Sequence, residues 1–94
     1  MRGPTAISNF TIPFDKVAVA TAELPDDMRE AVRWAAGYCR ARNLHVGDFA
    51  ALLKKPNGEA YSRDSVYHMF TGRRDESSLR PMVAAIERLR RVEE

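Results

Sequence analysis

The sequence predicts an all-α protein: a bundle of four to five helices preceded by an extended N-terminal arm. After residue 24, four stretches carry apolar residues at spacings of three and four, which is the period of an amphipathic helix. Short segments rich in proline, glycine, asparagine and serine separate these stretches. Because 94 residues suffice for one hydrophobic core, we expect residues 1–24 as the arm and residues 25–94 as a single helical domain.

The arm is expected to be extended because apolar residues recur along it with a period of two. Phe10, Ile12 and Phe14 alternate with polar residues and a proline, and Val17 and Val19 continue the alternation. An arm this apolar either lies across the helical body or pairs with another copy of the chain.

The first helix is expected to run from residue 25 to about Arg42. Pro25 suits the first turn, and the carboxylates of Asp26 and Asp27 complement the dipole of the helix there. Asn43 suits the left-handed residue that ends a helix. The expected buried stripe comprises Met28, Ala31, Val32, Ala35 and Cys39, with Trp34 and Tyr38 at its edge.

Two shorter helices follow. The first begins near Val46 and buries Phe49, Ala50, Leu52 and Leu53, and Pro56-Asn57-Gly58 follows as a breaker. Ser62 is expected to cap the second helix and Gly72 to end it. Its inward residues are expected to be Val66, Met69 and Phe70.

The last helix is expected to begin at Ser77 or Ser78. Its apolar residues recur at the helical period and end in a strongly charged tail. The expected buried stripe comprises Leu79, Met82, Val83, Ile86 and Leu89.

Several classes of protein are disfavoured by what the sequence lacks. No paired carboxylates share an apolar setting, and no phosphate-binding glycine loop or Ser-His-Asp pattern is present, so we expect neither an enzyme nor a bound cofactor. His45, His68 and Cys39 lack the spacing of a metal motif. With one cysteine, no long apolar run and no signal-peptide pattern, we expect a cytoplasmic protein without a membrane contact or an evident small-molecule substrate.

Positive charge is unevenly distributed along the chain. The first 27 residues carry two basic and four acidic side chains, whereas residues 28–94 carry thirteen basic and nine acidic ones. Only three of the fifteen basic residues are lysines. The planar donor fork of arginine suits phosphates and guanine edges, although a solvated helical surface explains the same composition.

The two middle helices form a helix-turn-helix, in which the second helix presents half its surface to solvent. Residues 46–53, with small Ala50 at the close packing position, resemble the first helix of the lambda-repressor/Cro-like family. The stretch YSRDSVYHMFTGRR, residues 61–74, resembles the second, with its terminal glycine and arginines, and the resemblance extends over about residues 26–91. It implies double-stranded DNA binding, as in a transcriptional regulator.

The connection between the two helices departs from that family. It is about six residues longer than the family's compact turn, and its extra segment, residues 54–60, forms either a loop or a short wing that touches the DNA backbone. A domain with an N-terminal arm and an elongated turn is also similar to the N-terminal DNA-binding domain of the phage Mu B type of transposition ATPases. That similarity implies a piece of a larger DNA-transaction protein.

The resemblance implies which residues contact DNA. Arg63 is expected to bind a guanine edge, and Tyr67 to bind a phosphate or touch a thymine methyl group. Asp64 either supports the helix start or contacts a cytosine. The full set of expected DNA-binding residues is Lys54, Lys55, Ser62, Arg63, Asp64, Tyr67, His68, Thr71, Arg73 and Arg74.

An alternative function uses other residues of the same fold. The apolar arm, or an aromatic patch formed by Trp34 and Tyr38, then serves as a contact for another protein or for a second copy in a homodimer. Core packing of these two aromatic residues is the simpler interpretation of their position beside the buried stripe.

Overall fold

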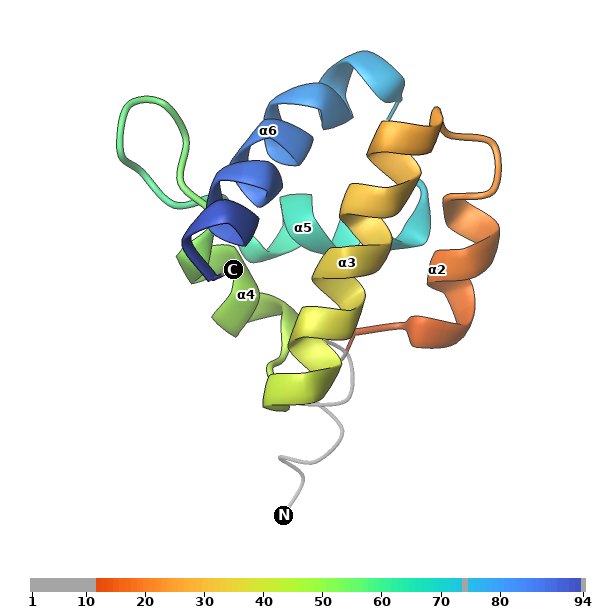
Figure 1. The fold of residues 1–94 in the computed structure, drawn as a ribbon, viewed down its shortest axis with the longest axis horizontal. Helices are drawn as coiled ribbons and strands as arrows, with labels where there is room; N and C mark the ends of the chain where they lie inside the picture. The colour runs from red at the N-terminus through yellow and green to blue at the C-terminus, as the bar shows by residue number, and fades with distance from the viewer. Residues whose placement is uncertain (1–11, 74, 94) are drawn as a thin grey trace.

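A computed structural model describes residues 12–73 and 75–93, and in this part of the chain five helices follow one another without a β-strand (Figure 1). The all-α prediction is therefore confirmed. The helices are α2 (Phe14–Ala20), α3 (Asp26–Arg42), α4 (Val46–Leu52), α5 (Arg63–Thr71) and α6 (Glu76–Glu93).

The helices pack in two groups around one core. The long helices α3 and α6 pack against each other, and α4 packs against α5, which crosses behind α3 in Figure 1. The short helix α2 packs against both α3 and α5. It therefore joins the two groups at the end of the molecule where α5 terminates.

The bounds of α3 agree with the predicted signals. Asp26 and Asp27 lie in its first turn, and Asn43 follows its last turn with φ 58° and ψ 42°, the left-handed conformation expected there. The predicted stripe on this helix is completely buried. Tyr38, predicted at the edge of the stripe, is also buried, whereas Trp34 is half-buried.

Aromatic rings from three helices meet in the core. Phe49 of α4 lies 6.2 Å from Phe70 of α5 and 6.0 Å from Tyr38 of α3, measured between ring centroids. Phe49 and Phe70 are fully buried. These tilted contacts fix α4 and α5 relative to each other and to α3, because offset and tilted ring pairs are the favourable geometries for aromatic side chains.

The extended N-terminal arm is wrong for residues 14–20, which form α2. Phe14, Val17 and Thr21 face inward at spacings of three and four, whereas Val19 is 79% exposed. The helical spacing was missed in the sequence because one of its inward residues, Thr21, is polar, and polar residues are mostly exposed. Its hydroxyl donates to the carbonyl of Val17 at 2.7 Å and accepts from Nε of Arg33 at 3.2 Å. Residues 1–11 of the predicted arm lie outside the described residues.

The predicted cap of the last helix is also wrong. Asp75, rather than Ser77 or Ser78, caps α6, because its carboxylate accepts from the backbone N–H of Ser78 at 3.2 Å and from the hydroxyl of Ser77 at 3.1 Å. Hydrogen bonds from Ser78 and Ser77 hold the pKa of the Asp75 carboxyl below its usual range. The cap is therefore present at neutral pH and is lost as the pH falls through that lowered pKa.

Replacing each of two glycines by alanine is expected to change the stability in opposite directions. Gly72 ends α5 with φ 75°, and a Cβ there lies 3.0 Å from the Cβ of Ala20 in α2. We expect Gly72→Ala to lower the free energy of unfolding by about 1–2 kcal/mol, from backbone strain and crowding. Gly37 is exposed within α3, and a Cβ added there meets no neighbouring atom of the described residues within 4 Å, so Gly37→Ala should raise the free energy by about 0.5–1 kcal/mol.

Urea unfolding of both variants beside the wild type measures this contrast. Equal midpoints for Gly72→Ala and the wild type would contradict the close seating of α2 on the end of α5.

Candidate nucleic-acid interface

Helix α5 begins and ends where the sequence predicts. Ser62 precedes it in an extended conformation, and its Oγ accepts a hydrogen bond from the backbone N–H of Ser65 at 3.1 Å. Gly72 follows it in the left-handed conformation, and the backbone N–H of Arg73 donates to the carbonyl of His68 at 2.9 Å. Both ends of the helix are therefore held by local hydrogen bonds that do not depend on a ligand.

The two faces of α5 differ as the amphipathic pattern predicts. Val66, Met69 and Phe70 are buried against the rest of the protein. The remaining face carries side chains that can donate or accept hydrogen bonds. Of these, Arg63 and Asp64 are exposed, and Ser65, Tyr67, His68 and Thr71 are half-buried.

The segment before α5 is a hairpin and not an irregular loop. Lys54 and Ala60 form an antiparallel bridge, and the N–H of Lys55 donates to the carbonyl of Glu59 at 2.7 Å. Gly58, with φ 92°, closes the turn by donating its N–H to the carbonyl of Lys55 at 2.9 Å. Residues 54–60 are all exposed, and the hairpin projects from the helical body in Figure 1. The segment is therefore a projecting hairpin, and its contact with the DNA backbone stays a prediction.

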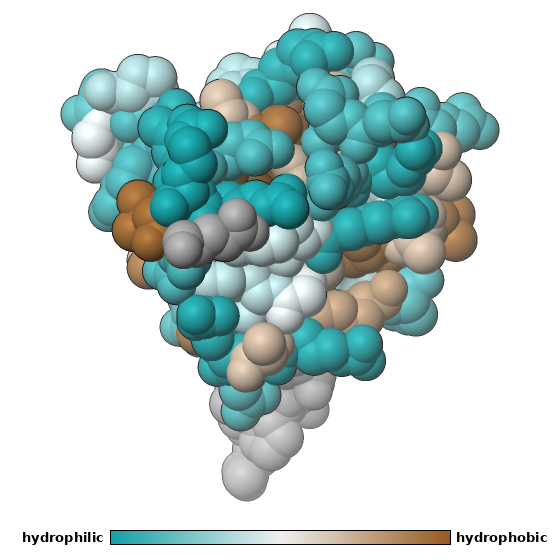
Figure 2. All heavy atoms as spheres, in the orientation of Figure 1, coloured by the Kyte–Doolittle hydropathy of each residue, from teal (hydrophilic) through white to brown (hydrophobic). Residues whose placement is uncertain are grey.

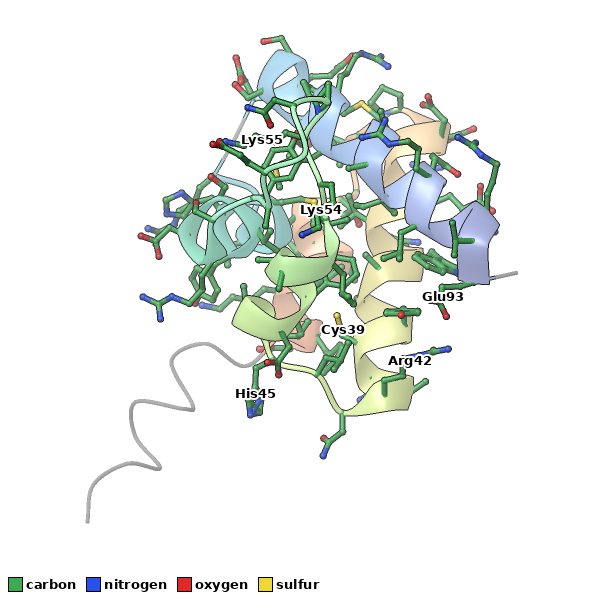
Figure 3. All side chains as sticks on the ribbon, turned by 90° about the vertical axis from the view of Figure 1, so that its left-hand side faces the viewer. Cys39, Arg42, His45, Lys54, Lys55 and Glu93 are labelled. Atoms are coloured by element: carbon green, nitrogen blue, oxygen red, sulfur yellow. The ribbon has the colours of Figure 1, made fainter. Side chains whose placement is uncertain are left out.

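The base of the hairpin is attached to two other parts of the protein. Leu53 is fully buried, and its carbonyl accepts from the N–H of Tyr61 at 3.0 Å. Arg88 of α6 donates from Nη2 to the carbonyl of Lys54 at 3.0 Å. The hairpin therefore has a fixed base. Figure 3 shows Lys54 and Lys55 along it, and Nζ of Lys55 lies 5.5 Å from the ring centroid of Tyr61.

A hollow of about 480 Å³ separates the hairpin from the first turns of α5 and α6. Its walls combine polar side chains with apolar and aromatic ones: Lys55, Pro56, Asn57, Tyr61, Ser65, Ser78, Pro81 and Met82. The hairpin consequently stands clear of α5, which leaves its lysines accessible beside the start of that helix.

The charges on this side are mixed, with cations in excess. The hairpin and α5 with its flanking residue carry the cations Lys54, Lys55, Arg63 and Arg73 and the carboxylates Glu59 and Asp64. Nε of Arg63 lies 3.9 Å from Oδ1 of Asp64, and both side chains are largely exposed, so solvent screens this pair. The aliphatic stem of Arg63 lies 3.8 Å from the Cβ position of Gly47 in α4. A larger residue at position 47 would crowd that stem.

The structure thus brings most of the predicted DNA-binding residues to one helix and its neighbouring hairpin. Lys54 and Lys55 precede the first residue of α5 in the chain, and Arg73 follows its last turn. The hydroxyl of Thr71 donates to the carbonyl of Tyr67 at 3.0 Å, so its proton is already used within the helix. Arg74 lies outside the described residues.

Three features of this region were missed by sequence reasoning. They are the strand-like pairing of the hairpin, its attachment by Arg88 and the contact of Arg63 with Gly47. Asn57-Gly58 is a familiar hairpin turn signal and was available in the sequence. The other two depend on residues 34 and 16 positions apart, which no local pattern connects.

Other chemistry in the described residues is limited. Burial raises the pKa of the Cys39 thiol to about 12, so this cysteine stays protonated at neutral pH and is a poor nucleophile. Within residues 12–73 and 75–93, no three His, Cys, Asp or Glu side chains gather closely enough to hold a metal ion. None of the helices in the same residues is long and apolar enough to cross a membrane.

Comparisons of the chain with protein-family models, with curated proteins and with solved structures found no match. The resemblance to helix-turn-helix domains therefore rests on the residues of this chain, and its functional content is a proposal.

Ser62 offers a test of whether its side chain stabilises the start of α5. We expect Ser62→Ala to lower the free energy of unfolding by about 1 kcal/mol, because the first turn of α5 loses its cap. Ser62→Asp supplies another capping oxygen and should keep the stability close to that of the wild type. Thermal unfolding of the two variants measures this, and equal losses in both would show that the cap is not what Ser62 contributes.

Proposed function

We propose that this protein binds double-stranded DNA, with α4 and α5 as a helix-turn-helix and α5 as the helix that enters the major groove. The observation that carries the proposal is the outer face of α5, which is polar along its length and flanked by cations at both ends. An α-helix with its side chains is about 10–12 Å in diameter, which suits a major groove about 12 Å wide.

The residues divide into two roles in this proposal. Arg63, exposed at the start of α5, reads a base edge in this proposal, because a guanidinium can donate two hydrogen bonds to guanine. Tyr67 and His68 lie about one turn further on and contact bases or sugars. Lys54, Lys55 and Arg73 bind phosphates and set the position of the helix in the groove.

The packing of α4 against α5 supports a fixed orientation of the polar face of α5. The contact between Phe49 and Phe70 holds α4 against α5 within the core. The hairpin replaces the compact turn of the lambda-repressor/Cro-like family and acts as a wing along the DNA backbone. The protein works either as a transcriptional regulator or as the DNA-binding domain of a larger DNA-transaction protein.

The first test measures binding of a fluorescein-labelled random duplex by anisotropy at increasing salt. We expect affinity to fall steeply, with a slope of about −0.9 in log–log form for each phosphate neutralised. Arg63→Ala combined with Arg73→Ala should weaken binding by about tenfold or more at low salt.

Arg80→Ala combined with Arg91→Ala is the matched control, since it removes the same charge from exposed positions of α6. A flat salt response, or equal affinity losses in the two double variants, would refute the proposed interface.

The second test addresses the hairpin. Lys54→Ala combined with Lys55→Ala should weaken binding to all duplex sequences alike and reduce the salt slope by about two, because two phosphate contacts are lost. Glu59→Gln removes a carboxylate from the same hairpin and should strengthen binding slightly. An unchanged salt slope in the lysine variant would exclude the hairpin from the DNA contact.

A further inference from the structure

The outer surface of α3 has a gap in its side chains at Gly37. This residue is exposed in the middle of the helix, and no neighbouring side chain of the described residues fills the space where its Cβ would lie. Two hollows of about 360 Å³ each open on either side and share Gly37 in their walls. We call this surface the Gly37 saddle. Figure 2 shows this side of the molecule, where pale and brown atoms lie among teal ones.

One hollow of the saddle is aromatic. Trp34 and Tyr38 stack with their ring centroids 5.0 Å apart. The guanidinium of Arg42 lies 4.1 Å from the Tyr38 centroid and pairs with Glu93 at 3.1 Å. Figure 3 shows Arg42 and Glu93 on facing parts of α3 and α6. These contacts hold the side chains of this wall in place, and the charge of Arg42 is already paired with that of Glu93.

The other hollow is apolar and lies between α2 and α3. Its walls include Phe14, Val17, Ala18 and Ala36, with Arg33 and Arg40 at the rim. The two arginines are seven residues apart on α3, so two helical turns, or about 10 Å, separate them with Gly37 between.

Neither of these two arginines has an acidic partner among the described residues. Arg33 donates to the Thr21 hydroxyl, and the guanidinium of Arg40 lies 4.6 Å from the Phe14 ring centroid. In residues 12–73 and 75–93 no carboxylate lies within ion-pair distance of either one. The apolar hollow between α2 and α3 is therefore bordered by positive charge that no described carboxylate neutralises.

We propose that the Gly37 saddle binds an acidic peptide segment of another protein. An apolar side chain of that segment occupies the hollow beside Gly37, and its carboxylates, about two helical turns apart, pair with Arg33 and Arg40. Guanidinium groups form strong hydrogen bonds with carboxylates, and the apolar floor supplies the buried anchor that a peptide interface needs.

A nucleic acid suits this surface less well than a peptide. Single-stranded nucleic acids bind by stacking bases on open aromatic faces. Here Trp34 and Tyr38 stack on each other, Arg42 covers Tyr38, and Arg40 covers the ring of Phe14 in the other hollow.

The saddle is separate from the proposed DNA interface. It lies on the outward side of α3, whereas α5 crosses behind that helix in Figure 1. The proposal therefore does not depend on DNA binding.

A peptide selection tests the proposal without assuming a sequence. A random peptide library displayed on phage is selected on the immobilised chain after depletion on the Gly37→Glu variant. Glutamate fills the gap and places a carboxylate between the two arginines, and it favours the helix more than glycine does, so the variant should fold. We expect enriched peptides with aspartate or glutamate on both sides of one apolar residue.

Anisotropy with the enriched peptides then locates the contact. Binding should weaken by about tenfold or more in Gly37→Glu and in the double variant Arg33→Glu with Arg40→Glu. Arg80→Ala combined with Arg91→Ala is the control outside the saddle and should bind the peptides normally, and Gly37→Glu should still bind the random duplex.

Four results would overturn the proposal. They are a selection that enriches no acidic peptide, equal peptide affinity in Gly37→Glu, displacement of the peptide by single-stranded or duplex DNA, and self-association of the wild type that Gly37→Glu abolishes. The third would reassign the saddle to nucleic acid and the fourth to a second copy of the chain.

Discussion

The contact of Phe49 with Phe70 and Tyr38 is the constraint on which the rest of the structure depends. It joins α4, α5 and α3 at one place in the core, with centroid separations of 6.0 and 6.2 Å. Since interiors are close-packed, a change in this cluster moves three helices at once. The angle at which α5 presents its polar face is therefore set by buried residues that no ligand touches.

Helix α2 has a second structural role, because it packs against both α3 and α5. Its Ala20 lies against Gly72 at the end of α5, and its Phe14 and Val17 line the hollow beside Gly37 on α3. One short helix thus borders both proposed binding surfaces. A partner that displaced α2 at one surface would therefore alter the packing of α2 at the other surface. The charges of the two surfaces would stay the same.

The helices were predicted well where a capping residue or a helical spacing of apolar residues lay within a short stretch of sequence. Asn43 and Gly72 both adopt the left-handed conformation expected of them, and Ser62 caps α5 as predicted. The prediction failed where the decisive partner was distant. Thr21 is buried because Arg33 and the carbonyl of Val17 satisfy its hydroxyl. Two leucines predicted to be buried are not fully so: Leu52 is 41% exposed at the end of α4, and Leu89 of α6 is half-buried.

The sequence by itself determined the helical class, the buried stripes of α3 and α5 and the position of the polar face on α5, because these follow from spacing along a single helix. Only the tertiary structure decided that Arg88 of α6 anchors the hairpin of residues 54–60, that the helix of residues 14–20 packs on α3 and α5, and that an apolar hollow lies beside Gly37 between α2 and α3. Each of these depends on residues far apart in the chain meeting in space, and hydrophobic periodicity carries no information about which distant residues meet.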